Sequence, residues 1–207
     1  MPSKIVIGKE PWLSMALEDW KLAEPLTVLI PFEIKLDHNY LFDFPNLDAF
    51  SPSEVTGFVA WGPEFLNFQR LELVGELKKR GFKLPPLIHP SAQISVTAKI
   101  QENVWIHALT CIGPNTLIEF NSCVSTGVKI GSNVIIQKST WLDKNVIVEH
   151  CAEIGANSFL GNRVEVSNNV IVGRQVRIEE PVRLLKDQPD KTFKIRASQL
   201  TGQIIKL

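Results

Sequence analysis

The sequence predicts a small α/β domain followed by a parallel β-helix with triangular coils. Three observations lead to this fold class. Aliphatic residues recur at every sixth position through half of the chain, and small or β-branched residues recur four positions after each of them. The segment 1–84 lacks this period and alternates strand and helix patterns. The 207 residues suffice for one ordinary domain or for two small ones.

The N-terminal part of the chain has the pattern of an open α/β domain. Three apolar runs predict strands, at residues 4–8, 26–31 and 57–61. Two further segments predict helices, at residues 11–22 and 64–80. Pro11 is acceptable in the first turn of the first helix, and the second ends in a basic run before Gly81. Residues 33–56 carry no clear period.

The repeat begins after Pro85 and Pro86, which mark the junction. All seventeen positions taken in steps of six from Ile88 to Leu184 are aliphatic. Neither a helix period of 3.6 nor a strand period of 2 explains a period of six with two inward columns. A triangular coil does, because each six-residue unit forms one flat face and three such units complete one coil. Slightly more than five coils then follow one another about 4.8 Å apart.

The composition excludes several classes of function. The 22 Lys and Arg residues balance the 22 Asp and Glu residues, so we expect neither nucleic acid nor a membrane surface as a partner. No apolar run is long enough to span a bilayer, and the N-terminal segment does not resemble a signal peptide, which predicts a cytoplasmic protein. The three cysteines form no CxxC pair, which predicts reduced thiols. His89 and His107 lack the partners of a three-histidine zinc site, so no metal is expected.

The repeat resembles the hexapeptide repeat of left-handed β-helix acyltransferases, and this resemblance implies the left hand. A closer resemblance covers nearly the whole chain. The α/β domain, together with the segments Leu87–Ala92, Ile154–Gly161 and Leu185–Asp190, is similar to the bacterial sialic acid O-acetyltransferase and bacillosamine N-acetyltransferase family. It implies a domain at 1–84, a β-helix at 85–185, an extended C-terminal tail at 186–207, and a homotrimer.

The same resemblance implies the chemistry. We expect an acetyl-CoA-dependent transferase that acts on a sugar or a nucleotide-linked amino sugar in surface-polysaccharide biosynthesis. Gly161, Gly173 and Arg177 are then expected to bind CoA, and Arg183 and Lys186 lie close enough in sequence to meet its phosphates. An outward apolar column that contains Cys123, Trp141 and Phe159 predicts a subunit interface.

The α/β domain departs from the family at its first turn. In the family, the first strand leads into a glycine-rich turn that lets phosphates approach backbone amides. Here only Gly8 is present, and Glu10 and Trp12 are predicted to crowd a pyrophosphate. A docking or structural role for this domain therefore stands beside nucleotide binding.

The candidate base is His150. Acetyl transfer needs a group that takes the proton of the acceptor, and histidine is the usual one. The family's histidine follows an acidic residue, and the pair Glu149 and His150 is the only one in phase with the repeat. Alignment of both ends of the chain, however, places the family's histidine at Ser132 and its second histidine at Trp141. His150 therefore lies one full coil away from the expected position.

Three hypotheses follow. In the first, His150 is the base of a displaced site, with Glu149 or Glu153 holding its imidazole. In the second, the site is lost and the chain is a catalytically degenerate homologue that serves as a non-catalytic binding or assembly protein. In the third, the site uses His107 or is completed by another subunit.

Overall fold

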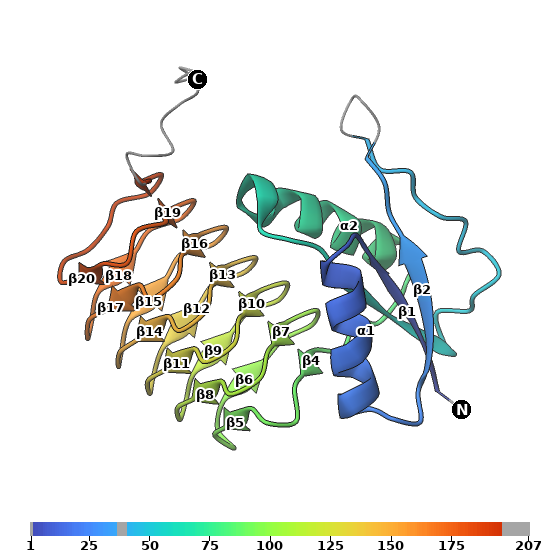
Figure 1. The fold of residues 1–207 in the computed structure, drawn as a ribbon, viewed down its shortest axis with the longest axis horizontal. Helices are drawn as coiled ribbons and strands as arrows, with labels where there is room; N and C mark the ends of the chain where they lie inside the picture. The colour runs from blue at the N-terminus through green and yellow to red at the C-terminus, as the bar shows by residue number, and fades with distance from the viewer. Residues whose placement is uncertain (1, 37–40, 196–207) are drawn as a thin grey trace.

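A computed structural model describes residues 2–36 and 41–195. It confirms the predicted fold class, an α/β domain followed by a left-handed parallel β-helix (Figure 1). The α/β domain lies beside the N-terminal coils of the solenoid, and α1 lies between its sheet and the solenoid (Figure 1). The helix α2 packs on the opposite face of the sheet. The two parts are therefore in contact over several coils.

The α/β domain is built on a three-stranded parallel sheet in the order β2-β1-β3. Its central strand is fully buried at Ile5, Val6 and Ile7, as its unbroken apolar sequence predicts. The elements are β1 (Ser3–Gly8), α1 (Trp12–Ala23), β2 (Val28–Glu33), β3 (Val55–Ala60), the 3-10 turn η1 (Glu64–Asn67) and α2 (Phe68–Lys79).

The predicted helix 64–80 is shorter than expected. Phe65, Leu66 and Asn67 have positive φ angles, so the regular helix begins only at Phe68. The side of α2 that faces inward carries Arg70 beside Leu73, Val74 and Leu77, whereas Phe68 is 45% exposed. The buried face of this helix therefore begins at Arg70, and the predicted helix is wrong over residues 64–67.

The solenoid has one two-residue strand at each of the seventeen aliphatic positions, and these strands form three parallel sheets. Each strand from β4 to β17 pairs with the strand 18 residues further along the chain, for example Cys123 with Trp141, which confirms the predicted coil. The first sheet contains β4 (Leu87–Ile88), β7 (Trp105–Ile106), β10 (Cys123–Val124), β13 (Trp141–Leu142), β16 (Phe159–Leu160), β19 (Arg177–Ile178) and β21 (Phe193–Lys194). The second contains β5 (Gln93–Ile94), β8 (Cys111–Ile112), β11 (Lys129–Ile130), β14 (Ile147–Val148), β17 (Glu165–Val166) and β20 (Arg183–Leu184). The third contains β6 (Lys99–Ile100), β9 (Leu117–Ile118), β12 (Ile135–Ile136), β15 (Glu153–Ile154) and β18 (Ile171–Val172).

Both inward columns meet in one core inside the solenoid. The aliphatic residues of the strands and the small residues at the corners form a single buried cluster that runs from Val104 to Leu184. Within the C-terminal segment, β21 adds a strand to the first sheet beside β19. Residues 196–207, which the prediction also assigned to the tail, lie outside the described residues.

A third column of residues forms the corners of the coils. At every sixth position from Asn103 to Gln175 the backbone has a positive φ, and Asn occupies seven of these positions. Asn tolerates this left-handed conformation better than other residues with a side chain. Leu109 adopts it with φ 58° and is 66% exposed, so the leucine gains little burial in return.

We therefore expect Leu109→Asn to stabilise the protein. The left-handed conformation costs most residues about 1–2 kcal/mol, so the gain should be about 1 kcal/mol and raise Tm by a few degrees. Thermal unfolding followed by circular dichroism measures it. The matched control is Asn169→Leu at another exposed corner (φ 60°), which should lower Tm by a similar amount. A Leu109→Asn protein with an unchanged or lower Tm would contradict the expectation.

The outward apolar column of the first sheet packs inside the chain, so the predicted subunit interface there is wrong. Trp105, Cys123, Trp141 and Phe159 share a buried cluster with α1 and with residues of β1 and β3. The ring of Trp12 lies 5.1 Å from that of Trp141 in an edge-on arrangement. The physical reason is that the chain's own helix covers this face, which leaves it no exposed area for a partner.

A polar contact runs beside this apolar one. We call Asn103, Asn121, Ser139 and Asn157 the corner ladder, because they occupy equivalent left-handed corners of successive coils. The side chain of Asn103 accepts from the Val59 backbone N–H at 2.8 Å, and Asn157 donates to the Leu66 carbonyl at 3.0 Å. The α/β domain is therefore fixed to the solenoid by directed hydrogen bonds as well as by apolar packing.

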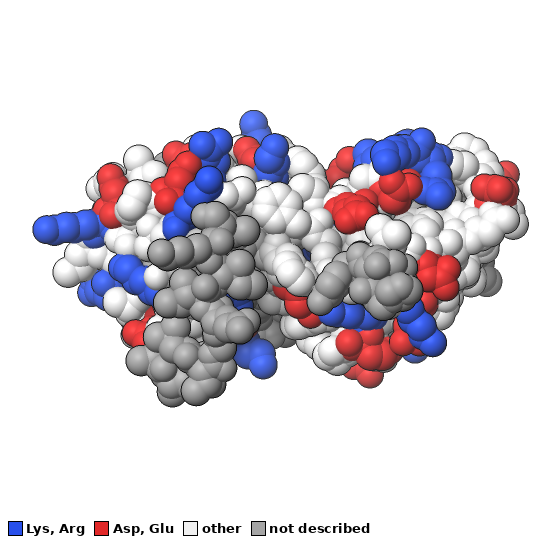
Figure 2. Space-filling view, turned by 90° about the horizontal axis from the view of Figure 1, so that it is seen from above, with Lys and Arg blue, Asp and Glu red and all other residues white. Residues whose placement is uncertain are grey.

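Positive and negative side chains intermingle on the face seen in Figure 2, with no extended area of one sign. This distribution agrees with the formal net charge of zero. Within residues 2–36 and 41–195, no helix has the length and apolar content needed to cross a membrane.

Candidate active site

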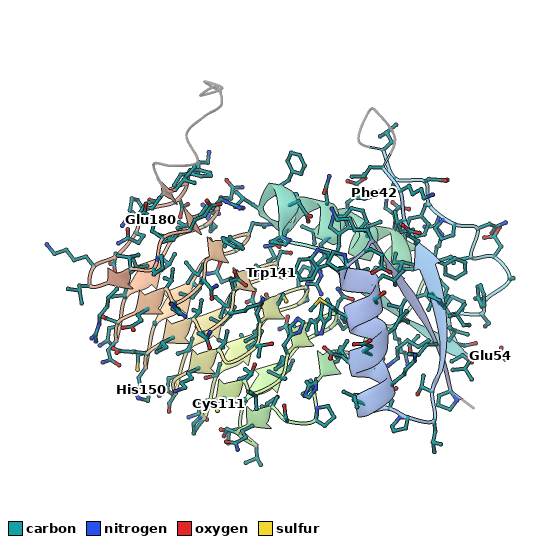
Figure 3. All side chains as sticks on the ribbon, viewed as in Figure 1. Phe42, Glu54, Cys111, Trp141, His150 and Glu180 are labelled. Atoms are coloured by element: carbon teal, nitrogen blue, oxygen red, sulfur yellow. The ribbon has the colours of Figure 1, made fainter. Side chains whose placement is uncertain are left out.

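His150 lies at a corner of the solenoid directly after β14, and its side chain is exposed. Figure 3 shows it at the edge of the solenoid away from the α/β domain, with Cys111 nearby and Trp141 at the junction with α1. The adjacent surface is hollowed into a groove with a volume of about 430 Å³. This His150 groove is lined by residues of successive coils: Gln93, Ile94, Ser95, Cys111, Ile112, Gly113, Ile130, Gly131, Ser132 and His150.

Two hydrogen bonds fix His150 between neighbouring coils. Its Nδ1 accepts from the backbone N–H of Ser132 at 2.9 Å, and its own backbone N–H donates to Oδ1 of Asn168 at 3.0 Å. A Cβ at Gly131 would lie 3.0 Å from Nδ1, so glycine at this position leaves room for the ring. Because the lone pair of Nδ1 is engaged, the proton of the neutral imidazole is on Nε2.

The predicted pairing of Glu149 or Glu153 with His150 is not formed. Oε1 of Glu149 accepts from Arg183 at 3.0 Å, and Oε2 accepts from the backbone N–H of Asn168 at 3.1 Å. Glu153 accepts from Gln137 instead. Arg183 and the Asn168 backbone therefore engage both carboxylate oxygens of Glu149. The structure therefore provides a carboxylate that supports Asn168 and leaves the imidazole to a backbone amide.

The two positions where the resemblance places catalytic histidines differ from each other. Ser132 lines the His150 groove and contacts His150 through its backbone. Trp141 is buried under α1 and does not line this groove. The structure thus brings His150 and Ser132 together and places Trp141 in the junction.

The residues predicted to bind CoA already have partners within the chain. The backbone N–H of Gly161 donates to the Ile178 carbonyl at 2.7 Å, and that of Gly173 donates to the Gln188 carbonyl at 2.8 Å. Nε of Arg177 donates to Glu179 at 2.6 Å. Any contact of the two glycines with a ligand therefore has to use atoms other than these N–H groups. Their role in CoA binding stays a prediction.

His107 lies in the junction and is unsuited to act as a base. Its ring stacks on Trp105 with centroids 4.3 Å apart, and its Nδ1 is 3.6 Å from the Asp19 carboxylate. Burial lowers the pKa of His107 to about 3, so it is a very weak base at neutral pH. Burial also raises the pKa of Asp19, which accepts from Nε1 of Trp105 at 2.9 Å. This buried cluster disfavours the hypothesis that the site uses His107.

Burial likewise raises the pKa of the Cys123 thiol to about 12, so this cysteine is not a nucleophile. Cys111 and Cys151 are exposed, free thiols. No group of three or more His, Cys, Asp or Glu side chains in the described part of the chain could hold a metal ion.

The turn after β1, where the resemblance predicts a phosphate-binding loop, makes its contacts within the chain. The carboxylate of Glu10 lies at the N-terminus of α1, where it accepts from the hydroxyl of Ser14 at 2.8 Å. Lys9 pairs with Glu64 at 2.7 Å. A Cβ at Gly8 would lie 2.0 Å from the Ala60 carbonyl oxygen, so this glycine serves strand packing. A carboxylate at this helix N-terminus would repel a phosphate, and the crowding of a pyrophosphate by Glu10 and Trp12 stays a prediction.

The chain matches one protein family model and is similar in fold to several solved structures. The model of the GMPPB C-terminal domain family matches residues 83–186, which are 104 of the 207 residues. A search of curated protein sequences finds no match.

The solved structures that cover nearly the whole chain include the following three. A histidine-to-asparagine mutant of perosamine N-acetyltransferase from Caulobacter crescentus, in complex with CoA and GDP-perosamine, has a TM-score of 0.79 and 21% identity over 93% of each chain. The acetyltransferase domain of PglB from Neisseria gonorrhoeae, in complex with acetyl coenzyme A, has a TM-score of 0.77 and 21% identity over 93% of this chain and 95% of that chain. WeeI from Acinetobacter baumannii has a TM-score of 0.57 and 15% identity over 92% and 95%. At these identities the likeness shows a shared fold.

Proposed function

We propose that the chain, which belongs to the GMPPB C-terminal domain family, is an acetyl-CoA-dependent transferase that acetylates a sugar or a nucleotide-linked amino sugar. One observation carries the proposal. The α/β domain and the solenoid align together, over 93% of both chains, with an N-acetyltransferase whose crystals contain CoA and GDP-perosamine. If the two proteins shared only the hexapeptide repeat, their N-terminal domains would not align.

The His150 groove is the proposed place of reaction. Its volume of about 430 Å³ is within the usual range for a small-molecule site. Asn168, which Glu149 supports, and Ser132 hold His150 at its edge. Acetyl-CoA would supply the acetyl group as a thioester. The thioester end of acetyl-CoA and the acceptor fit a groove of this size, whereas the nucleotide end of CoA requires contacts outside it.

Further parts of the proposal rest on the family resemblance. We propose that Gly161, Gly173 and Arg177 contribute to CoA binding, that the protein is a homotrimer, and that it acts in the cytoplasm in surface-polysaccharide biosynthesis. We also propose a domain boundary between residues 84 and 85 and the end of the solenoid near residue 185, although β21 extends one of its sheets.

Calorimetric titration of the full chain with acetyl-CoA tests the proposal. We expect binding with a Kd below about 1 mM, weakened in Arg177→Met by about tenfold if a charged contact worth about 1.4 kcal/mol is lost. Arg163→Met, at an exposed corner, is the matched control and should leave the affinity unchanged. The absence of binding at millimolar acetyl-CoA would contradict the enzyme class as a whole.

The second candidate function is a non-catalytic binding or assembly protein. It is favoured by one observation: within the described residues, no carboxylate forms an ion pair with His150. A protein that binds acetyl-CoA but transfers acetyl to no member of a panel of nucleotide-linked amino sugars and their hydroxyl counterparts would support this candidate. Transfer to any of them would exclude it.

A further inference from the structure

The environment of His150 determines what its ring can do in the proposed reaction. Nδ1 accepts the Ser132 N–H at 2.9 Å, so the other ring nitrogen, Nε2, carries the proton of the neutral ring. A base needs a free lone pair directed at the substrate. Nε2 in this tautomer has none, and it offers an N–H donor instead.

The surrounding groups hold this arrangement. The His150 backbone is tied to Asn168, and the Asn168 backbone is tied to Glu149, which Arg183 in turn holds at 3.0 Å. An Nδ1–H group would need a hydrogen-bond acceptor, such as a carboxylate or a carbonyl, beside it. The group beside Nδ1 is instead the Ser132 backbone N–H, which is a donor. The ring therefore cannot take the Nδ1–H tautomer without losing its contact to Ser132.

We infer that His150 acts as a hydrogen-bond donor through Nε2 to the thioester carbonyl oxygen, and that the acceptor of the acetyl group is therefore an amine and not a hydroxyl. This inference rests on the proposed acetyl transfer. It specifies the substrate class, because the two acceptors differ in their need for a base.

The chemistry balances without a base at His150. The neutral amine nitrogen attacks the carbonyl carbon, and the carbonyl oxygen takes the electron pair and accepts the hydrogen bond from Nε2. The carbon–sulfur bond then breaks, and the CoA thiolate leaves with its electron pair. The thiolate takes up the proton that the attacking nitrogen loses, which gives the amide and free CoA. A hydroxyl has to lose its proton as it attacks, and no free lone pair of His150 is available to take it.

Matched substitutions separate a donor from a base. The side-chain amide of Gln places an N–H donor near the position of Nε2, whereas Ala places nothing there. We expect His150→Ala to lower kcat by about 100- to 1000-fold, as the loss of a donor to a developing oxyanion does, and His150→Gln to stay within about tenfold of the parent. Equal losses in both variants would show that His150 acts as a base and overturn the donor role.

Two readouts complete the test. In protein labelled with ¹⁵N-histidine, two-bond ¹H–¹⁵N spectra at pH 8, assigned with His150→Gln, should show His150 as the Nε2–H tautomer; the Nδ1–H tautomer overturns the inference whatever the activity. Acetyl transfer to a panel of nucleotide-linked amino sugars and their hydroxyl counterparts should occur only at amines. Transfer to a hydroxyl overturns the assignment of an amine acceptor. The same holds if the protein binds acetyl-CoA but transfers acetyl to none of the amines. The absence of acetyl-CoA binding instead overturns the proposed function, and the spectra still decide the tautomer.

Discussion

Replacing Arg70 with methionine is expected to lower the free energy of unfolding by about 3 to 6 kcal/mol. Arg70 is fully buried where α2 meets the solenoid. Its guanidinium donates to the backbone carbonyls of Asn121 and Asn103, the latter at 2.9 Å, and more weakly to that of Val59 at 3.4 Å. Methionine fills a similar volume but leaves these buried carbonyls without a donor. Two hydrogen bonds from a charged donor, each worth about 1.5–3 kcal/mol, set the size of the loss.

The charge of Arg70 does not reverse this expectation. Burial lowers the pKa of Arg70 to about 10, so the guanidinium remains protonated at neutral pH. Its hydrogen bonds are therefore charge-assisted, which makes them stronger than bonds between neutral groups. Removal of a buried charge recovers part of its desolvation cost, but the carbonyls of two successive coils then have no partner in the apolar junction.

Urea unfolding followed by circular dichroism measures the effect. Arg70→Lys should lose about half as much, because a single ammonium cannot span two carbonyls one coil apart as the planar guanidinium does. The matched control is Arg80→Met at the other end of α2. The Arg80 side chain is 36% exposed and pairs with Glu76 on the same helix, so its loss should cost below about 1 kcal/mol. A midpoint of Arg70→Met equal to that of the parent would contradict the expectation.

The solenoid could be predicted from the sequence because its rule is local. A period of six with large and small inward residues is imposed by the geometry of each face, so it is visible without any long-range contact. The left-handed corners follow an equally local rule, and their recurring asparagines, such as Asn115 and Asn133, were available as a signal. The strands of the α/β domain were predictable for the same reason, with only small shifts at their ends.

The junction and the site could not be predicted in the same way, because they depend on which elements meet in space. The column of Trp141 and Phe159 has the composition of a subunit interface, and only the position of α1 shows that it is covered within the chain. Arg70 is one cation among several in its helix, and nothing in its spacing marks it as buried. The sequence places His150 one coil after Ser132, so their proximity could be anticipated. That the Ser132 backbone N–H donates a hydrogen bond to the His150 ring depends on the orientation of the side chain, which the spacing does not determine.

The stability of the protein is expected to fall by about 2 kcal/mol between pH 7.5 and pH 5 because of His107. In the folded state burial lowers the pKa of His107 to about 3, from an ordinary value of 6.5. Above pH 6.5 the ring is neutral in both states, so it adds no pH dependence. As the pH falls below 6.5, the unfolded chain binds a proton that the folded chain does not bind until about pH 3. Stability is therefore lost across this window at about 1.4 kcal/mol per pH unit.

The charged groups around His107 also affect how stability depends on pH. Most of them lower the pKa of His107, as burial does, and Asp19 is the exception. Arg70, His89 and Lys144 all disfavour the imidazolium. Asp19 opposes them, because burial raises the pKa of its carboxyl, and the folded state then gains relative stability as Asp19 protonates at low pH.

Urea unfolding at pH 7.5, 6 and 5 tests the linkage in the parent, His107→Gln and Asp19→Asn. Glutamine cannot take up a proton, so His107→Gln should lose this acid sensitivity even if it is less stable at every pH. Asp19→Asn retains His107 and should retain most of that sensitivity, which distinguishes the histidine from its neighbour. A parent and a His107→Gln protein whose stabilities fall in parallel from pH 7.5 to 5 would mean that His107 is protonated in the folded state. The junction would then have to hold a charged imidazolium against Asp19, and His107 would again be available as a proton carrier.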